Sequence, residues 1–282
     1  MTLLSCGATT ILLLRVRTVP SILNKERQLK FRFSFSFIVC ATLALSACGE
    51  ATPGQAEAAS SVRLQGAGAS FPAPLYNKWF KAYGASHRNV LVDYQSVGSG
   101  GGIKSVMDHT VDFGASDAAM KPEDMAKVPD GVQLFPMTAG SIVLAYNIQG
   151  VDALKLSRKA YAGIFLGRVK RWNDPLVAEA NPGANLPDLP VNVVVRADSS
   201  GTSFVFSKHL SAMSDEFNSS VGANTMPNWP AGTKSKGNEG VTASIMSTPG
   251  SIGYIEYGYA LSQKLPMAVL ENKSGNFVEA ST

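Results

Sequence analysis

Three short loops combine glycines with side chains that donate hydrogen bonds. They are GAGASFPAP at 66–74, GSGGGIK at 98–104 and RADSSGTSF at 196–204. Their candidate donors are the hydroxyls of Ser70, Ser99, Ser200 and Thr202, the guanidinium of Arg196, and several backbone N–H groups. Donors that converge on one point favour an anion as the ligand. Serine and threonine are also preferred at helix N-caps, and one hydroxyl can serve both purposes.

The glycine loop at 98–104 does not fit a nucleotide-binding motif. A Walker A loop has a second glycine directly before its lysine, but Ile103 precedes Lys104 here. A dinucleotide fingerprint that starts at Gly98 also requires glycine at 103. The loop follows an expected strand at 90–95 and precedes an expected helix at 102–107. A helix N-terminus attracts anions, although this loop alone would also suit a flexible turn.

The elements that must position these loops alternate along the chain. Expected strands at 62–65, 90–95 and 141–148 are interleaved with expected helices, and I-, V- and Y-rich stretches continue this pattern to about residue 260. The alternation predicts an α/β fold with mostly parallel sheets. In such sheets ligands bind beyond the carboxyl ends of the strands, where all three loops would lie.

The N-terminal 48 residues have the pattern of an export signal. Basic residues at 25–32 precede an apolar stretch of 15 residues at 33–47, which is too short for a membrane span. It ends in LSAC at 45–48, which resembles the lipobox of bacterial lipoproteins. Cys48 is therefore the expected lipidation site. The alternative is an ordinary cleaved signal in which Cys48 is not lipidated. A second apolar run, TTILLLRV at 9–16, has no assigned role. Residues 49–61 are small and polar, as in a flexible tether.

The charge and cysteine content exclude several classes of function. The net charge of +4 comes from the leader, because 19 basic and 20 acidic residues follow Cys48, so no basic field indicates a nucleic-acid partner. The three cysteines lie at positions 6, 40 and 48. The domain after Cys48 therefore has no disulfide, cysteine metal site or thiol nucleophile.

Eight stretches of the chain resemble the substrate-binding protein of the bacterial ABC-type phosphate importer. They include GAGASFPAPLYNKW at 66–79, YQSVGSGGGIKSV at 94–106, TVDFGASDAAM at 110–120, VVRADSSGTSFVFSKHL at 194–210 and NWPAGTKSKGNEGV at 228–241. The resemblance implies a two-lobed periplasmic-binding-protein fold, type II-like, with phosphate in the cleft between the lobes. It implies that lobe 1 comprises residues 62–146 with 254–282 returning to it, and that lobe 2 comprises residues 147–253.

The same resemblance assigns a role to nine residues. Ser70 and Phe71 supply a hydroxyl and an N–H, and Ser99 supplies a hydroxyl and an N–H. Asp117 accepts a proton from the ligand, and Arg196 donates to phosphate and is held by Asp198. Ser200, Gly201 and Thr202 cradle the anion at a helix start. Members of this family continue beyond the segment that resembles 269–282. The first lobe is therefore expected to be incomplete at its C-terminal end.

A binding protein rather than an enzyme is the expectation. His87, His109 and His209 do not have ligand spacing, and neither HExxH nor GxSxG occurs, so no metal or other cofactor is expected. The expected protein is a monomer in the periplasm or cell envelope, held to the membrane only by a lipid anchor, that passes phosphate to an ABC-type permease. A binder of another tetrahedral oxyanion and, less favoured, a phosphatase-like extracellular enzyme are the alternatives.

Overall fold

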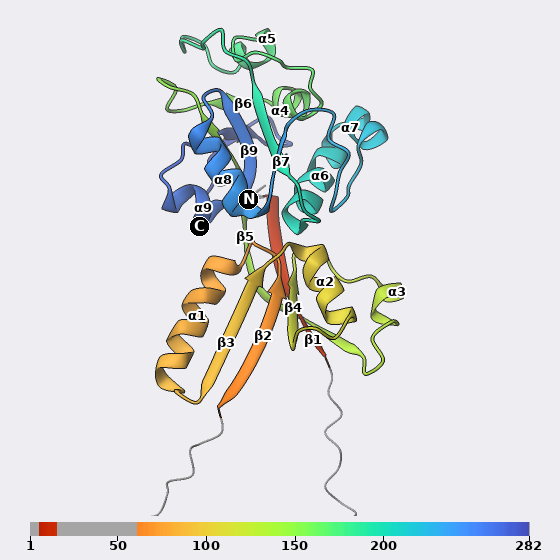
Figure 1. The fold of residues 1–282 in the computed structure, drawn as a ribbon. Coiled ribbons are helices and arrows are strands. Elements are labelled where there is room, and N and C mark those ends of the chain that lie inside the picture. Colours follow the sequence, from red (N-terminus) through yellow and green to blue (C-terminus); the bar gives the residue numbers. More distant parts are fainter. Residues whose placement is uncertain (1–5, 16–60, 282) are drawn as a thin grey trace, which may run out of the picture.

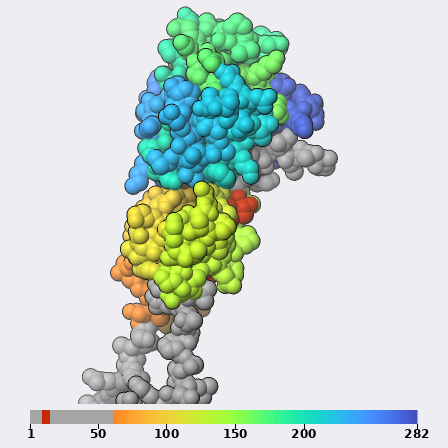
Figure 2. All heavy atoms as spheres, turned by 90° about the vertical axis from the view of Figure 1, so that its right-hand side faces the viewer, coloured from red at the N-terminus to blue at the C-terminus, as the bar shows by residue number. Residues whose placement is uncertain are grey.

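The computed structural model describes residues 6–15 and 61–281. These residues form two lobes, one above the other in Figure 1, and Figure 2 shows a narrow waist between them. The strands are β1 (Cys6–Arg15), β2 (Val62–Gly68), β3 (Val90–Ser96), β4 (Phe113–Ser116), β5 (Val132–Asn147), β6 (Lys155–Leu156), β7 (Asn192–Arg196), β8 (Thr233–Ser235), β9 (Ser251–Glu256), β10 (Val269–Glu271) and β11 (Phe277–Val278). The helices are α1 (Ala73–Ser86), α2 (Ser99–Met107), α3 (Pro122–Met125), α4 (Arg158–Phe165), α5 (Pro175–Ala178), α6 (Gly201–Met213), α7 (Asp215–Ser220), α8 (Gly237–Ser247) and α9 (Tyr257–Ser262).

One eight-stranded sheet runs through both lobes in the order β3-β2-β4-β1-β5-β9-β7-β8. The outer strands of this sheet pair in parallel, since β2 pairs with β3 and β4, and β7 pairs with β8 and β9. The antiparallel pairs lie in the middle of the sheet, where β1 contacts β4 and β5, and β5 contacts β9. The α/β architecture predicted from the sequence is confirmed, and β5 is the long strand that joins the lobes (Figure 1).

Each lobe has its own apolar core. In the upper lobe, aromatic side chains pack around α6 and β9, with Phe206 and Tyr254 stacked at a centroid distance of 4.8 Å and Phe165 edge-on to Phe206 at 4.7 Å. In the lower lobe, a smaller cluster includes Leu13 and Val106. The second half of β5 is buried on both faces, as expected for a strand covered by helices on each side.

Strand β1 lies inside the stretch that the sequence assigns to the leader. It pairs antiparallel with β4 over residues 11–14 and with β5 along its full length, with a register shift between Thr10 and Ile11. Leu13 is fully buried in the lower-lobe core. The apolar run at 9–16, which had no assigned role, therefore contributes a central strand in this structure, while Cys48 lies outside the described residues.

The resemblance assigns residues 254–282 to the first lobe, and the last strands of this segment pair with a strand of the upper lobe. Strand β10 pairs parallel with β6, which lies within 147–253, and β11 pairs with β10. These strands form a separate three-stranded sheet on the upper lobe. The lobe boundaries that the resemblance implies remain predictions. In the part of the chain that the structure describes, we find no helix with the length and apolar character of a membrane span.

Candidate functional site

The N-terminal ends of four helices meet at the waist between the lobes. Helices α1 and α2 belong to the lower lobe, and α6 and α8 to the upper one. The two lobes are joined there by short hydrogen bonds: the Gly201 N–H donates to the Ser99 hydroxyl at 3.0 Å, and the Asn238 side-chain amide donates to the Ser70 hydroxyl at 2.8 Å. Helix N-termini carry unpaired N–H groups and a partial positive charge, so this arrangement favours an anion.

The Ser99 hydroxyl can act only as a donor toward a ligand. Its oxygen accepts hydrogen bonds from the backbone N–H groups of Asp117, at 3.1 Å, and Gly201, at 3.0 Å. A hydroxyl has two lone pairs and one proton, and both lone pairs are occupied here. The fully buried Ser99 must therefore donate its proton to an acceptor.

Two further buried hydroxyls have the same arrangement. The Ser70 oxygen accepts from the backbone N–H of Asn238 at 3.0 Å and from its side-chain amide at 2.8 Å. The Thr202 oxygen accepts from Arg196 Nη1 and from Asn238 Nδ2, both at 3.3 Å. Three hydroxyls from three loops thus have both lone pairs occupied by N–H donors, and each presents only a proton to a ligand.

Arg196 and Asp198 form a buried ion pair at the end of β7. Arg196 donates from Nε to Asp198 Oδ1 at 2.8 Å and from Nη2 to Oδ2 at 2.5 Å, while the Gly237 N–H donates to Oδ1 at 3.0 Å. Burial acts to raise the pKa of Asp198, but the hydrogen bonds and charge of Arg196 hold it below its ordinary value. A two-point contact of this kind fixes the plane of the guanidinium and directs Nη1 toward Thr202.

Asp117 follows β4 directly, and its carboxyl group is buried beside Ser99 and Arg196. The Thr10 hydroxyl of β1 donates to Asp117 Oδ1 at 2.8 Å. Burial raises the pKa of Asp117 to about 7, against the opposing effects of the Thr10 hydrogen bond, the Arg196 charge and the Ser99 hydroxyl. Near neutral pH this group therefore exists both as an accepting carboxylate and as a donating carboxylic acid.

The close approach of the lobes requires glycine at two positions. Gly98 has a φ of 84°, in the left-handed region that side chains disfavour. A Cβ atom at Gly201 would lie 2.5 Å from both Asp117 Cβ and Ser99 Oγ. A side chain at 201 would therefore separate α6 from the lower lobe and break the Ser99 contact.

The structure brings most of the predicted site residues into two adjacent hydrogen-bonded groups at the waist, which together we call the waist network. One group contains Ser99, Asp117 and Gly201. The other contains Ser70, Arg196, Asp198 and Thr202, with Asn238 between Ser70 and Thr202. Ser200 lies beside the waist network and caps α6 by accepting from the Ser203 N–H at 3.1 Å. The Phe71 side chain is buried and belongs to the upper-lobe core cluster. Their roles as ligands of phosphate remain predictions.

Three contributors were missed in the sequence. Asn238 contacts Ser70 and Thr202, Thr10 contacts Asp117, and the Tyr254 hydroxyl accepts from the Arg196 N–H at 3.1 Å. For Asn238 a signal existed, because KGNEG places a polar residue directly after a glycine at the start of a helix. Nothing in the sequence around Thr10 or Tyr254 indicates a place at this site.

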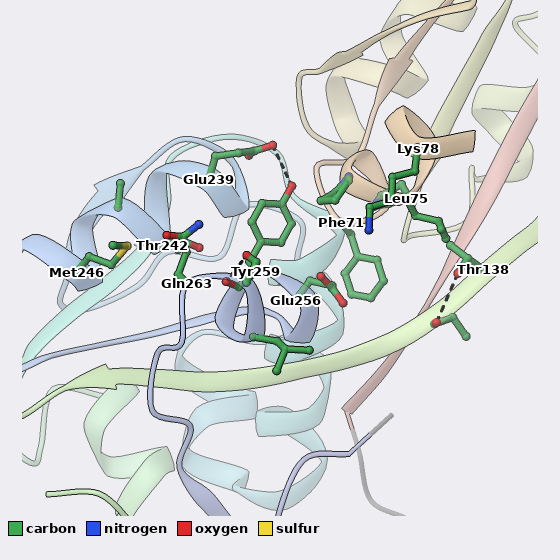
Figure 3. A pocket seen from close by; sticks show the side chains of 17 residues that line it. Phe71, Leu75, Lys78, Thr138, Glu239, Thr242, Met246, Glu256, Tyr259 and Gln263 are labelled. Atoms are coloured by element: carbon green, nitrogen blue, oxygen red, sulfur yellow. Dashed lines mark hydrogen bonds between the residues drawn. The ribbon is translucent and has the colours of Figure 1, made fainter. Parts of the chain in front are cut away.

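A further hydrogen-bonded group connects the lobes beside the waist network. The Tyr259 hydroxyl lies 2.7 Å from the Ser70 carbonyl oxygen and 3.0 Å from Glu239 Oε1, and the Ser96 hydroxyl donates to the same Glu239 oxygen at 3.1 Å. Figure 3 shows Tyr259 pointing toward Glu239, with Phe71 and Glu256 nearby. We call Ser96, Glu239 and Tyr259 the lateral contact.

A cavity of about 830 Å³ opens between α1 and the helices α8 and α9. Leu75 and Lys78 line it from the lower lobe, and Met246 and Gln263 from the upper lobe (Figure 3). Its lining does not include the donor hydroxyls of Ser70, Ser99 or Thr202. The candidate anion site is therefore the buried network at the waist rather than this open groove. Among the described residues no group of three or more His, Cys, Asp or Glu side chains has the geometry to hold a metal ion.

Residues 53–282 match the family model of the PBP superfamily domain. The phosphate-binding protein PstS of Xylella fastidiosa is 42% identical over 232 residues, which cover 82% of this chain and 63% of that protein. The phosphate-binding protein PstS2 of Mycobacterium bovis is 32% identical over 256 residues, covering 85% of this chain and 69% of that protein. The chain thus spans a little under two thirds of the first of these relatives.

The fold is similar to that of a solved high-affinity periplasmic phosphate-binding protein bound with phosphate, PfluDING. The TM-score is 0.61 at 20% sequence identity, with 78% of this chain and 65% of that chain covered. At this identity the similarity establishes the two-lobed fold, which agrees with the architecture expected from the sequence.

Proposed function

The chain belongs to the PBP superfamily and, within it, to the family of PstS phosphate-binding proteins, and from this premise we propose that it binds inorganic phosphate at the waist between its lobes. In this proposal the protein works outside the cytoplasmic membrane, in the periplasm or cell envelope, as a monomer that delivers phosphate to an ABC-type permease. The direction of the hydrogen bonds at the waist carries the proposal.

The hydroxyls of Ser70, Ser99 and Thr202 can offer only protons to a ligand, since N–H groups occupy their lone pairs. Arg196 adds a positive charge whose orientation Asp198 fixes. A site with these properties excludes cations and favours an oxyanion with several acceptor oxygens. Phe71, Ser200 and Gly201 complete the proposed set of ligand-binding residues. Phe71 offers its backbone N–H and Ser200 its hydroxyl, while Gly201 acts through its N–H bond to the Ser99 hydroxyl.

Asp117 distinguishes phosphate from other tetrahedral oxyanions in this proposal. A carboxylate beside an anion is repulsive unless the ligand carries a proton that the carboxylate can accept. Phosphate is protonated near neutral pH, whereas sulfate is not. This residue therefore favours phosphate over the alternative of a general oxyanion binder.

Calorimetric titration of the purified full-length chain with inorganic phosphate at pH 8 tests the proposal. We expect saturable binding with one phosphate per chain, while sulfate at the same concentrations gives no heat of binding. A chain that is folded by circular dichroism and shows no phosphate binding would contradict the proposal. The same samples decide between binding and catalysis: we expect no release of phosphate from phosphate monoesters, and turnover without added metal would favour the phosphatase-like alternative.

A lipid anchor at Cys48 is the second part of the proposal. The LSAC sequence at 45–48 supports it, because it ends an apolar stretch of the length typical of a signal. Firm attachment requires more than one acyl chain, as a single chain binds membranes only marginally. In cell fractionation, Cys48→Ala should move the protein from the membrane pellet to the soluble fraction; a variant that remains in the pellet like the wild type would rule out anchoring through this residue.

A further inference from the structure

Asn238 occupies a central place at the waist that the resemblance did not assign to it. It is the second residue of α8 in the upper lobe and is fully buried. Its side-chain Nδ2 lies 2.8 Å from the hydroxyl of Ser70 in the lower lobe and 3.3 Å from the hydroxyl of Thr202 in the upper lobe. One amide group thus donates to two candidate ligand-binding hydroxyls that belong to different lobes.

We propose that Asn238 is a positioning residue of the anion site, which turns the protons of the Ser70 and Thr202 hydroxyls toward the ligand. The proposal rests on the proposed function, since it assumes that these hydroxyls contact phosphate. Asn238 acts through them and need not touch the ligand itself.

The chemistry of the amide explains why asparagine suits this position. Its NH₂ group has two protons, one for each hydroxyl oxygen, and no lone pair that could accept from them. Each hydroxyl is therefore left with its proton free for an acceptor elsewhere. An aspartate of the same size would do the opposite, because its carboxylate would accept both hydroxyl protons and turn them away from the ligand.

The other hydrogen bonds of Asn238 fix the orientation of its amide. The backbone N–H of Glu256 donates to Asn238 Oδ1 at 2.9 Å, which identifies this atom as the acceptor and places Nδ2 toward the hydroxyls. The Thr242 hydroxyl donates to the Asn238 carbonyl oxygen at 2.7 Å, one turn later in α8. A flipped amide would lose the Glu256 bond and set an N–H against another N–H, so the observed orientation is strongly favoured.

A double-mutant cycle tests whether Asn238 acts through the hydroxyls. Phosphate affinity is measured by calorimetry for the wild type, Asn238→Ala, the pair Ser70→Ala with Thr202→Val, and the triple variant. We expect Asn238→Ala to weaken binding by about tenfold in the wild-type background, as two hydroxyls lose their fixed direction. In the background without the hydroxyls the same change should weaken binding less than twofold, because no proton remains to be directed.

Asn238→Asp provides a second measurement that a packing role would not reproduce. Asp has the size of Asn, so a residue that only fills space would tolerate Asp better than Ala. If the direction of the hydrogen bonds matters, Asp must weaken phosphate binding more than Ala does. Asn181→Ala is the matched control, because Asn181 is a buried asparagine of the same lobe whose side chain bonds only to backbone groups around β6 and α5. We expect this control to lower the melting temperature without changing phosphate affinity.

The possible outcomes separate the inference from the function on which it rests. A wild-type chain that does not bind phosphate contradicts both. A wild type that binds phosphate, with equal losses from Asn238→Ala in both backgrounds, overturns the inference alone. Asn238 would likewise have a purely structural role if Asn238→Ala weakened phosphate binding more than Asn238→Asp does. The same conclusion would follow if Asn181→Ala lost as much phosphate affinity as Asn238→Ala.

Discussion

The pKa of Asp117 predicts that the exclusion of sulfate depends on pH. As a carboxylate, Asp117 repels sulfate, which has no proton to donate. As a carboxylic acid, the same group can donate its own proton to a sulfate oxygen, and the repulsion becomes a hydrogen bond. Because burial raises the pKa of this group to about 7, the neutral acid predominates below pH 7 and the carboxylate above it. Sulfate affinity should therefore rise as the pH falls through 7.

The size of the effect follows from the fraction of Asp117 that is protonated. With a pKa of about 7, roughly 3% of the group is protonated at pH 8.5 and roughly 97% at pH 5.5. If only the protonated form binds sulfate, the dissociation constant should fall about 30-fold between these two pH values. The dissociation constant of phosphate should change less with pH, because phosphate can donate a proton to Asp117 when Asp117 is a carboxylate.

The assay is a calorimetric titration with sulfate at half-unit steps from pH 8.5 to 5.5, over which sulfate remains a dianion. Asp117→Asn should bind sulfate at every pH, because an amide donates without titrating. The exposed Asp152, which is not among the predicted site residues, provides the control: Asp152→Asn should keep the wild-type pH profile. A sulfate dissociation constant that does not change with pH in the wild type, or a profile unchanged in Asp117→Asn, would refute this role for Asp117.

Three further predictions concern the contacts around this group. Arg196→Ala should weaken phosphate binding at least tenfold in calorimetry, since it removes a charged donor from the buried network; an unchanged dissociation constant would remove Arg196 from the site. Tyr259→Phe removes the hydroxyl that joins Glu239 to the Ser70 carbonyl oxygen, so phosphate should dissociate several-fold faster in stopped-flow measurements, whereas an unchanged rate would mean that the lateral contact does not hold the lobes together. Thr10→Val removes a hydrogen bond that lowers the pKa of Asp117. The sulfate midpoint, which is the pH at the middle of the change in sulfate affinity, should therefore be higher than in the wild type. A shift of this midpoint to lower pH would contradict the effect of Thr10 on Asp117.

The local part of this site could be predicted because its signals lie within a few residues of one another. Ser99 follows a glycine with positive φ and begins α2, and Ser200 caps α6 just after the strand that ends at Arg196. A strand, a small polar loop and a helix start together indicate an anion site without knowledge of the rest of the fold. The pairing of Arg196 with Asp198 also spans only two residues.

The contacts that cross the waist could not be read from the sequence in the same way. Asn238 is 168 positions from Ser70, and Tyr259 is 189 positions from it. The role of each depends on where β5 and β9 place the upper lobe against the lower one, which no local pattern encodes. The direction of the three hydroxyls is a property of this assembly, and so is the elevated pKa of Asp117, which requires burial by elements from both ends of the chain.

Strand β1 shows most clearly why a local pattern was insufficient. An apolar run such as TTILLLRV suits part of a signal or a buried strand equally well, and only its partners decide between them. Here β4 and β5 offer hydrogen-bonding edges on either side of β1, and unpaired edges of this kind are unfavourable.

The proposed processing before Cys48 would separate β1 from the rest of the chain. If the strand dissociates, the Thr10 bond to Asp117 would be lost. A processed chain without β1 should then have its sulfate midpoint at higher pH, as in Thr10→Val. The pH dependence of sulfate affinity therefore reports whether this strand is in place.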